Sequence, residues 1–332
     1  MKFGILGCRH AHIELFIQEM LDLGHELVAI CEAIPDIAQP FADKYGVPLL
    51  TDEKDFFDLK PQVVGTAPAA VNNEKINVIE ACRAHSVHVI ADKPIVTNMD
   101  DFQRLKEIMD EGVIEVGLML TERFSPPIYA LWKMVQDGVL GEIISFSMTK
   151  PHKLNEKARA PWHFSKTQNG GIVIDLLIHD FDLLRWFTGS EMENLTGYVR
   201  KSTSPKYAEF YDSVHTVVKM ESGVIATIEA DWWTPDAYWT WGDGRIFCTG
   251  TLGRAEIRAT GDQNNKSPYG LLVTKENDCI VYENSIPPVT LAEDFINRIK
   301  GNKDVIITAQ DVLSATHDTL VADHKLRESP LY

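Results

Sequence analysis

The sequence is poor in basic residues. Its 332 residues include 32 Lys and Arg against 48 Asp and Glu, which gives a formal net charge of −16 at pH 7. A surface with this charge repels a phosphate backbone, so we expect no nucleic-acid partner. A bound dinucleotide remains compatible, because it requires only a local group of backbone N–H donors and one or two cations.

Long apolar runs and paired cysteines are also missing. No segment reaches the roughly 18 uninterrupted apolar residues of a membrane helix, so we expect a soluble protein without a membrane partner. The 5 cysteines form no C-x-x-C pair, which suggests reduced thiols and a cytoplasmic location. The short apolar run from Met1 to Cys8 lacks a basic leader and is interpreted as a buried strand, not as a signal peptide.

The first part of the chain alternates short apolar runs with helical stretches. This alternation is typical of an α/β fold, in which a doubly wound parallel sheet is covered on both faces and ligands bind outside the carboxyl ends of the strands. Strands are expected at residues 2–6, 26–31, 63–66, 87–91 and 114–118. Helices are expected at residues 13–23, 37–45, 73–84 and 99–111. The length exceeds that of one ordinary core, so we predict a first domain at residues 1–121.

The remainder, residues 122–332, has consecutive strand patterns separated by Gly, Asp and Asn. Such a pattern indicates an α+β domain with an open, mostly antiparallel sheet. Its strands are expected at residues 142–149, 194–200, 215–220, 224–231, 244–248, 254–259 and 271–275. Its helices are expected at residues 128–137, 171–187, 291–300 and 309–326.

A dinucleotide-binding loop, G-x-G-x-x-G, is incomplete after the first strand. The chain has G-C-R-H-A-H at residues 7–12, so only the first glycine, Gly7, is kept. Either the cofactor sits differently or Arg9 contacts phosphate through its guanidinium. A polar turn without a ligand is the alternative interpretation.

Glu32 ends the second strand, at the distance from this loop where an acid accepts hydrogen bonds from the adenosine ribose. A carboxylate there disfavours a 2′-phosphate, and Ala33 and Ile34 follow it instead of Arg or Ser. We therefore favour NAD over NADP. A surface acid at a strand end is the alternative.

Two later segments supply a lysine, a carboxylate and an imidazole. Lys93 follows an expected strand, and Asp175 and His179 are four residues apart in an apolar, helical run. Residues at this spacing share a helix face, so the carboxylate can orient the imidazole as a proton acceptor. The three groups fit removal of a proton from a carbinol while a hydride leaves its carbon. Alternatively, Asp175 and His179 bind a metal with His163 or His215, as in a metal-dependent lyase or hydrolase, but we predict no metal site.

Several segments together resemble the Gfo/Idh/MocA oxidoreductase family over almost the whole length. They are Asp92-Lys93-Pro94, Thr121–Pro126, Gly138–Ile143, Gly170–His179 and Asp182–Trp186. The resemblance implies a Rossmann domain followed by a domain with an open antiparallel sheet, frequently paired into homodimers or homotetramers. The chain departs from the family pattern in the missing glycines, in Asp92 for Glu and in Leu177 for Gly.

The resemblance also implies roles for individual residues. Lys93 would contact the nicotinamide ribose and the substrate, His179 would transfer the proton, and Asp175 would assist it. The expected cofactor contacts are Gly7, Arg9, His10, Ala11, Glu32, Pro68, Lys93 and Pro94. The expected substrate contacts are Lys93, Arg123, Trp162, His163, Asp175 and His179. The activity implied is NAD(P)-dependent oxidation of a secondary alcohol; a sensor without catalysis is the rival interpretation.

The sequence has 7 tryptophans, and Trp232, Trp233, Trp239 and Trp241 are clustered. Aromatic faces stack on sugar or cyclitol rings, which favours a carbohydrate-like substrate, although a core or a subunit interface explains such a cluster equally well. Four cations, Arg123, Lys150, His152 and Arg159, could bind a substrate carboxylate or phosphate, with solvated surface charge as the alternative for most of them.

Overall fold

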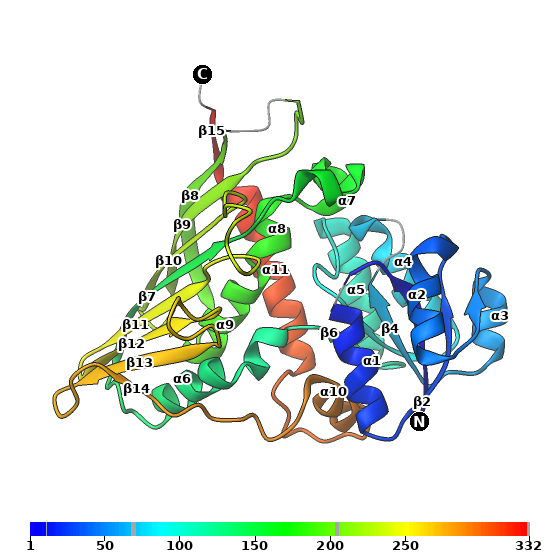
Figure 1. Ribbon diagram of the computed structural model, residues 1–332, viewed down its shortest axis with the longest axis horizontal. Helices are drawn as coiled ribbons and strands as arrows, with labels where there is room; N and C mark the ends of the chain where they lie inside the picture. The colour runs from blue at the N-terminus through cyan, green and yellow to red at the C-terminus, as the bar shows by residue number, and fades with distance from the viewer. Residues whose placement is uncertain (11, 68–70, 203–205, 331–332) are drawn as a thin grey trace. The chain divides into compact units, whose positions relative to one another are not determined.

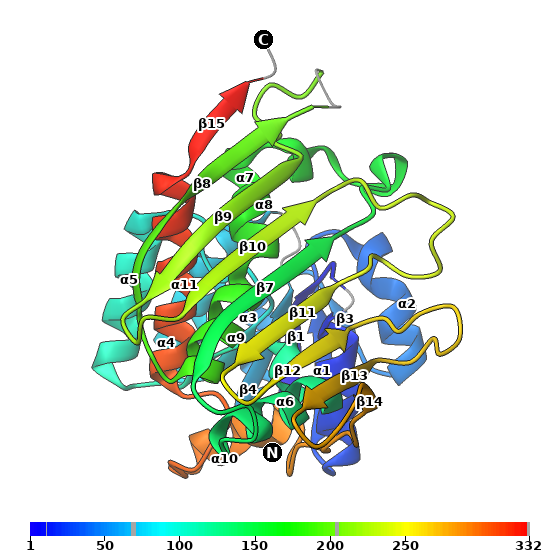
Figure 2. The same cartoon turned by 90° about the vertical axis from the view of Figure 1, so that its left-hand side faces the viewer.

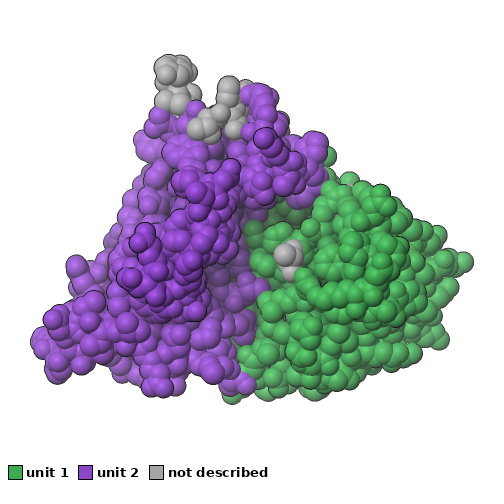
Figure 3. All heavy atoms as spheres, viewed as in Figure 1, with its two compact units in different colours: residues 1–120, 167–170, 289–317 green, residues 121–166, 171–288, 318–332 purple. Residues whose placement is uncertain are grey.

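The computed structural model describes residues 1–10, 12–67, 71–202 and 206–330 (Figure 1). The chain forms two compact units, which Figure 3 shows in different colours. Unit 1 comprises Met1–Leu120, Thr167–Gly170 and Val289–His317, and unit 2 comprises the rest. The expected domains, residues 1–121 and 122–332, remain a prediction. The first boundary between the compact units lies after residue 120, but two later segments also belong to unit 1.

Unit 1 is built on a six-stranded parallel sheet with the order β3-β2-β1-β4-β5-β6. Its strands are β1 (Lys2–Cys8), β2 (Glu26–Cys31), β3 (Leu49–Leu50), β4 (Val63–Ala67), β5 (His88–Ala91) and β6 (Val116–Leu118). Its helices are α1 (His12–Asp22), α2 (Pro35–Tyr45), α3 (Glu53–Asp58), α4 (Lys75–Ala84), α5 (Met99–Glu111) and α10 (Leu291–Ile299), with a 3₁₀ turn at Asn72–Glu74. This is the predicted doubly wound sheet.

The strands of this sheet carry apolar side chains on both faces because helices cover both of them. Phe3, Ile5, Val63, Val64 and Val89 are all 0% exposed. The carboxyl ends of β1, β4 and β5 therefore lie at one edge of a rigid layer. That edge is where the loops carrying the expected cofactor contacts begin.

Unit 2 is built on a nine-stranded sheet with the order β14-β13-β12-β11-β7-β10-β9-β8-β15 (Figure 2). Its strands are β7 (Ile143–Pro151), β8 (Met192–Lys201), β9 (Ser213–Met220), β10 (Ile225–Asp231), β11 (Arg245–Gly250), β12 (Gly253–Arg258), β13 (Tyr269–Thr274), β14 (Ile280–Val281) and β15 (Arg327–Pro330). Its helices are α6 (Pro126–Gln136), α8 (Ile172–Leu176) and α9 (Ile178–Thr188), with 3₁₀ turns at Thr121–Phe124, Glu156–Ala158 and Pro161–Phe164. Two helices have residues in both units: α7 (Lys166–Asn169) and α11 (Ala309–Lys325).

This second sheet is mostly antiparallel, as predicted; β7 and β10 are parallel, and so are β8 and β15. Its strands alternate buried and exposed side chains, which shows that one face is covered and the other is not. Helices α6, α8 and α9 pack on the covered face, and Figure 2 shows the uncovered face with no helix in front of it. Throughout the described ranges, no helix combines the length and the apolar character needed to cross a membrane.

Candidate active site

The loop after β1 presents a guanidinium at the carboxyl edge of the first sheet. Gly7 has φ 84°, a conformation that favours glycine, and the Arg9 N–H donates to the Ala67 carbonyl at the end of β4 (3.1 Å). The Arg9 Nε atom is buried and has no hydrogen-bond partner among the described residues. A buried guanidinium donor at this edge fits a cofactor pyrophosphate. Ala11 and Pro68, two further expected contacts, lie outside the described residues.

His10 and His12 are both bound to the residue that precedes Lys93. Their Nδ1 atoms lie 3.0 Å and 2.8 Å from the two carboxylate oxygens of Asp92, which is 2% exposed. Burial alone would raise the pKa of Asp92, but the hydrogen bonds from His10 and His12 outweigh it and hold the pKa well below its usual range. The two histidines thus stabilise the buried carboxylate and tie the first loop to the end of β5.

The same three side chains form a potential metal site within the described part of the chain. One ligand atom from each of His10, His12 and Asp92 lies within 4.8 Å of the other two. The ligands considered from the sequence lie elsewhere. His215 is in β9, its side chain is 65% exposed, and its Nδ1 pairs with Glu229 (3.2 Å). His163, the other histidine considered as a third ligand, is buried, with 4% of its surface exposed.

Glu32 stands at the end of β2, as expected, but its carboxylate is 1% exposed. It accepts hydrogen bonds from the N–H groups of Cys8 (3.4 Å) and Ile34 (3.0 Å). The carboxylate therefore holds the first loop and its own strand end together. Its contact with an adenosine ribose stays a prediction.

The backbone around Lys93 is held by Lys75, a residue that no sequence pattern selects. The Lys75 side chain is 0% exposed, and its Nζ donates to the carbonyl oxygens of Asp92 (2.6 Å) and Pro94 (2.5 Å). These carbonyls flank Lys93, so the buried ammonium fixes the backbone from which Lys93 extends. A lysine at the start of a helix has no distinguishing pattern, and the partners are 17 and 19 residues away.

A pair of amides fixes the segment that leads into the predicted catalytic helix. The Asn72 side chain donates to the Asn169 side chain (2.8 Å), and both residues are buried. Gly170 and Gly171 follow with φ 97° and 83°, which only glycine adopts without strain. The Gly-Gly step thus turns the chain into α8. Its role at this turn was not evident from the sequence.

Asp175 and His179 lie on two short helices and not on the single helix expected at residues 171–187. Leu177 separates α8 from α9, with φ −84° and ψ −2°. The backbone stays nearly helical, because Leu177 N–H donates to Val173 and Phe181 N–H donates to Leu177, both at 3.0 Å. Asp175 is 7% exposed and His179 is 6% exposed. Both predicted proton-transfer groups are therefore largely removed from water.

A largely buried ion network in unit 2 includes Asp180, the residue that follows His179. Lys150 Nζ lies 2.7 Å from Glu122 Oε1 and 3.2 Å from Asp180 Oδ2. Burial raises the pKa of Asp180 to about 7 against the attraction of Lys150, and the Glu122 charge adds to this rise. Burial alone would raise the pKa of Glu122. The positive charge of Lys150, and to a smaller extent that of His179, outweighs burial and lowers this pKa to about 2. One lysine thus serves two carboxylates, and the charge of one disfavours ionisation of the other.

Arg123, an expected substrate contact, is committed to a different partner. Its side chain is 1% exposed and donates through Nη2 and Nε to the two carboxylate oxygens of Asp182 (2.7 Å and 2.9 Å). The guanidinium carbon also lies 5.1 Å from the Trp186 ring centroid. This bidentate pair holds the start of unit 2 against α9. We therefore omit Arg123 from the substrate contacts proposed below.

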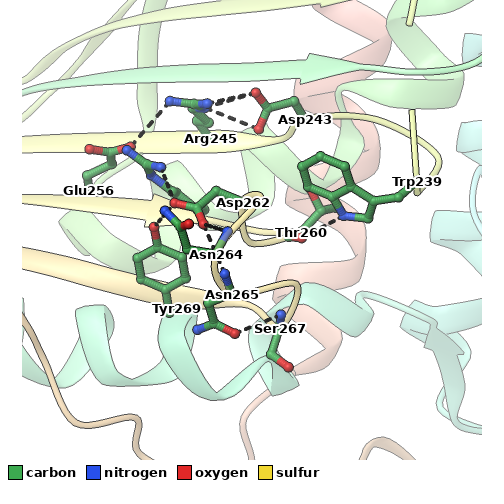
Figure 4. Close-up of polar contacts among 11 residues, drawn as sticks. Trp239, Asp243, Arg245, Glu256, Thr260, Asp262, Asn264, Asn265, Ser267 and Tyr269 are labelled. Carbon is green, nitrogen blue, oxygen red and sulfur yellow. Dashed lines mark hydrogen bonds and ion pairs between the residues drawn. The ribbon is translucent and has the colours of Figure 1, made fainter. Parts of the chain in front are cut away.

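The tryptophan cluster is divided between the core and the surface. Trp232 is 4% exposed and its ring lies 5.2 Å from that of His163, whereas Trp233 and Trp241 are 44% and 42% exposed. Trp239 Nε1 donates to the Thr260 carbonyl (3.3 Å), beside a network centred on Arg245 and Asp262 (Figure 4). Of the four, Trp232 is thus the buried one and the one in contact with a predicted substrate residue.

Comparison with known proteins identifies the family. Residues 1–116 match the model of the oxidoreductase family with an NAD-binding Rossmann fold, and residues 128–256 match the GFO/IDH/MocA C-terminal domain. The chain belongs to the Gfo/Idh/MocA oxidoreductase family. It is accordingly an oxidoreductase with an NAD-binding Rossmann fold. Family membership therefore supports the oxidoreductase interpretation over the sensor.

Relatives within this family are similar over most of their length. An inositol 2-dehydrogenase of Rhizobium meliloti is 24% identical over 301 residues, 87% of this chain and 86% of that protein. A myo-inositol 2-dehydrogenase of Thermotoga maritima is 25% identical over 329 residues, 94% of this chain and 92% of that protein. The crystal structure of an oxidoreductase from Erwinia carotovora atroseptica has a TM-score of 0.89 at 23% identity, with 100% of both chains covered. It shares the fold described above.

Proposed function

We propose that this enzyme binds NAD(H) and reversibly oxidises a secondary alcohol of a sugar, cyclitol or related polyol. Dehydrogenases named for inositol align with 87% and 94% of the chain, which supports a ring polyol as substrate. The observation that carries the proposal is the buried pair Asp175 and His179, on consecutive turns within a family of dehydrogenases. A proton acceptor held away from water suits removal of a hydroxyl proton.

The residues of unit 1 fit the cofactor. Arg9, with its buried Nε, would bind the pyrophosphate, and Glu32 would accept hydrogen bonds from the adenosine ribose. When bound, NAD⁺ supplies the acceptor for the hydride that leaves the carbinol carbon. A carboxylate at position 32 repels a 2′-phosphate, so we propose NAD over NADP.

The protein side of the reaction is a single proton transfer. His179 accepts the hydroxyl proton as the carbonyl bond forms, and Asp175 stabilises the imidazolium that results. Lys93, fixed by Lys75 through the flanking carbonyls, contacts the substrate oxygen and disfavours its protonation. Reduction of the ketone uses the same groups in the opposite order.

His179→Asn tests this assignment. We expect kcat/KM for a polyol found by screening sugars and inositols to fall about 10²–10⁴-fold, the usual contribution of a general base, while NADH affinity changes less than twofold. The control is His215→Asn, which alters an exposed histidine of β9. Fluorescence titration should also show tighter binding of NADH than of NADPH. A loss of less than tenfold in His179→Asn would refute the role of His179.

A further inference from the structure

One cation near the proposed active site has no carboxylate partner in the described part of the chain. Of the four cations singled out from the sequence, Arg123 is paired with Asp182, and Lys150 lies between Glu122 and Asp180. Among the described residues, the Arg159 side chain forms one hydrogen bond, from Nε to the Leu154 carbonyl (2.8 Å), and its guanidinium carbon lies 4.8 Å from the Trp232 ring centroid. These contacts orient the guanidinium but leave its terminal nitrogens available.

The guanidinium of Arg159 is held in a poorly solvated place. Burial lowers the pKa of Arg159, and the negative charge of Asp175 opposes this shift. A cation removed from water is costly unless an anion compensates it. The negative charge of Asp175 acts on Arg159, but no ion pair within 4.0 Å joins these two side chains. A bound anion would supply the missing compensation.

Two neighbouring indole groups are also donors without an acceptor. The Nε1 atoms of Trp162 and Trp232 are buried and have no hydrogen-bond partner among the residues the structure describes. Indole and guanidinium groups donate hydrogen bonds and accept none. The ring of His163 lies 6.1 Å from that of Trp162 and 5.2 Å from that of Trp232, so one aromatic group joins these donors. These donors therefore suit a ligand rich in acceptors.

This cluster belongs to the same part of unit 2 as the proposed proton-transfer pair. Trp232 directly follows β10, and α8, which carries Asp175, packs against β10. The guanidinium carbon of Arg159 lies 4.8 Å from the Trp232 ring centroid, so this series of contacts links Arg159 to the helix that carries Asp175. A substrate that reaches Asp175 and His179 can therefore extend to Arg159.

We propose that Arg159 binds a carboxylate of the substrate, with Trp162 and Trp232 as accessory donors, so that the polyol oxidised by this enzyme is a sugar acid. This inference rests on the proposed function and narrows its substrate to aldonic or uronic acids. A planar guanidinium matches a carboxylate in a bidentate geometry. A single cation balances one negative charge, which favours a carboxylate over a phosphate dianion.

The test is calorimetric binding of matched pairs of compounds to the 332-residue chain, with and without NADH. D-Glucuronate is compared with D-glucose, D-gluconate with D-glucitol, and D-glucose 6-phosphate serves as the phosphate probe. We expect an acid to bind at least tenfold more tightly than its neutral partner. Arg159→Gln should abolish that preference and leave the neutral partner within twofold, and Arg159→Lys should restore only part of it.

The control is Arg254→Gln, which removes an exposed arginine of β12 and should change neither affinity. In turnover assays the Arg159→Gln defect should appear in KM for the acid, with kcat changed less than threefold. The proposal is overturned if no acid binds more tightly than its neutral partner, if the phosphate binds best, or if Arg159→Gln weakens both members equally. Failure of NADH to bind the wild-type protein would instead count against the proposed function. The two failures can be told apart, because binding of the acids is also measured without cofactor.

Discussion

At the scale of single residues, the largest fully buried side chain is a charged one, Arg123. Removal of one partner from a buried ion pair leaves the other charge uncompensated. We therefore expect Arg123→Met to lower the free energy of unfolding by about 3–5 kcal/mol, measured by urea denaturation. Arg123→Met combined with Asp182→Leu removes both charges and should recover most of the loss. A double variant as unstable as the single one would contradict this account.

Asp180 makes a pH-dependent contribution to stability. Its pKa, about 7 in the folded chain, lies above the ordinary value of 3.8, so the folded state binds the proton more tightly than the unfolded state does. The resulting stabilisation of the folded state is fully present below about pH 4 and is lost as the pH rises through about 7. From pH 5 to 8 we expect the wild type to lose roughly 1–3 kcal/mol relative to Asp180→Asn, in urea denaturation at each pH. The opposite contribution of Glu122, whose pKa is lowered to about 2, arises below this range. Parallel pH profiles for the two proteins would exclude the raised pKa.

Sequence patterns located residues that belong to a motif and missed those that support it. Lys93, Asp175 and His179 stand out through spacing, and their roles remain predictions. Lys75 could not be predicted, because its function depends on carbonyl oxygens that only the fold brings within reach. The attachment of His10 and His12 to Asp92 joins groups about 80 residues apart, which no local pattern reports.

At the scale of elements, β4 depends on a residue without a side chain. A Cβ at Gly65 would lie 2.7 Å from Cδ1 of Phe16, whose ring is 0% exposed. We expect Gly65→Ala to lower the free energy of unfolding by about 1–3 kcal/mol, the usual cost of overpacking a core. In a double-mutant cycle, Phe16→Leu should make Gly65→Ala less costly, because the smaller side chain leaves room. Additive effects of the two substitutions would contradict direct contact.

The expected strands and helices were found where hydrophobic periodicity is long and regular. The expected bounds of β2 and α5 agree with the structure at every residue, Glu26–Cys31 and Met99–Glu111. Short elements were missed: β3, β14, β15 and α3 have 2 to 6 residues, too few for a period to be recognised. The interruption at Leu177 was also missed, since Leu continues an apolar helical pattern.

At the scale of the whole molecule, the uncovered face of the nine-stranded sheet carries several large apolar side chains. They include Tyr198, Val217, Ile225, Phe247 and Val273, which are 39–53% exposed. Large apolar side chains on an uncovered sheet face favour an interaction surface, and we propose that a second copy of the chain covers it. We expect light scattering to show a dimer or tetramer, and Val217→Glu combined with Phe247→Glu to release monomers. The control is Val113→Glu, a change at an exposed apolar residue of unit 1.

Unit 1 is completed by residues that follow most of unit 2 in the chain. A Cβ added at Gly117 of β6 would lie 2.9 Å from the aromatic ring of Phe295 in α10. The Ala292 N–H of α10 also donates to Glu19 of α1 (2.8 Å). A ribosome adds roughly 5–20 residues per second, so α10 is made several seconds or more after β6. During synthesis, one flank of the nascent nucleotide-binding sheet must therefore stay uncovered until α10 has been made.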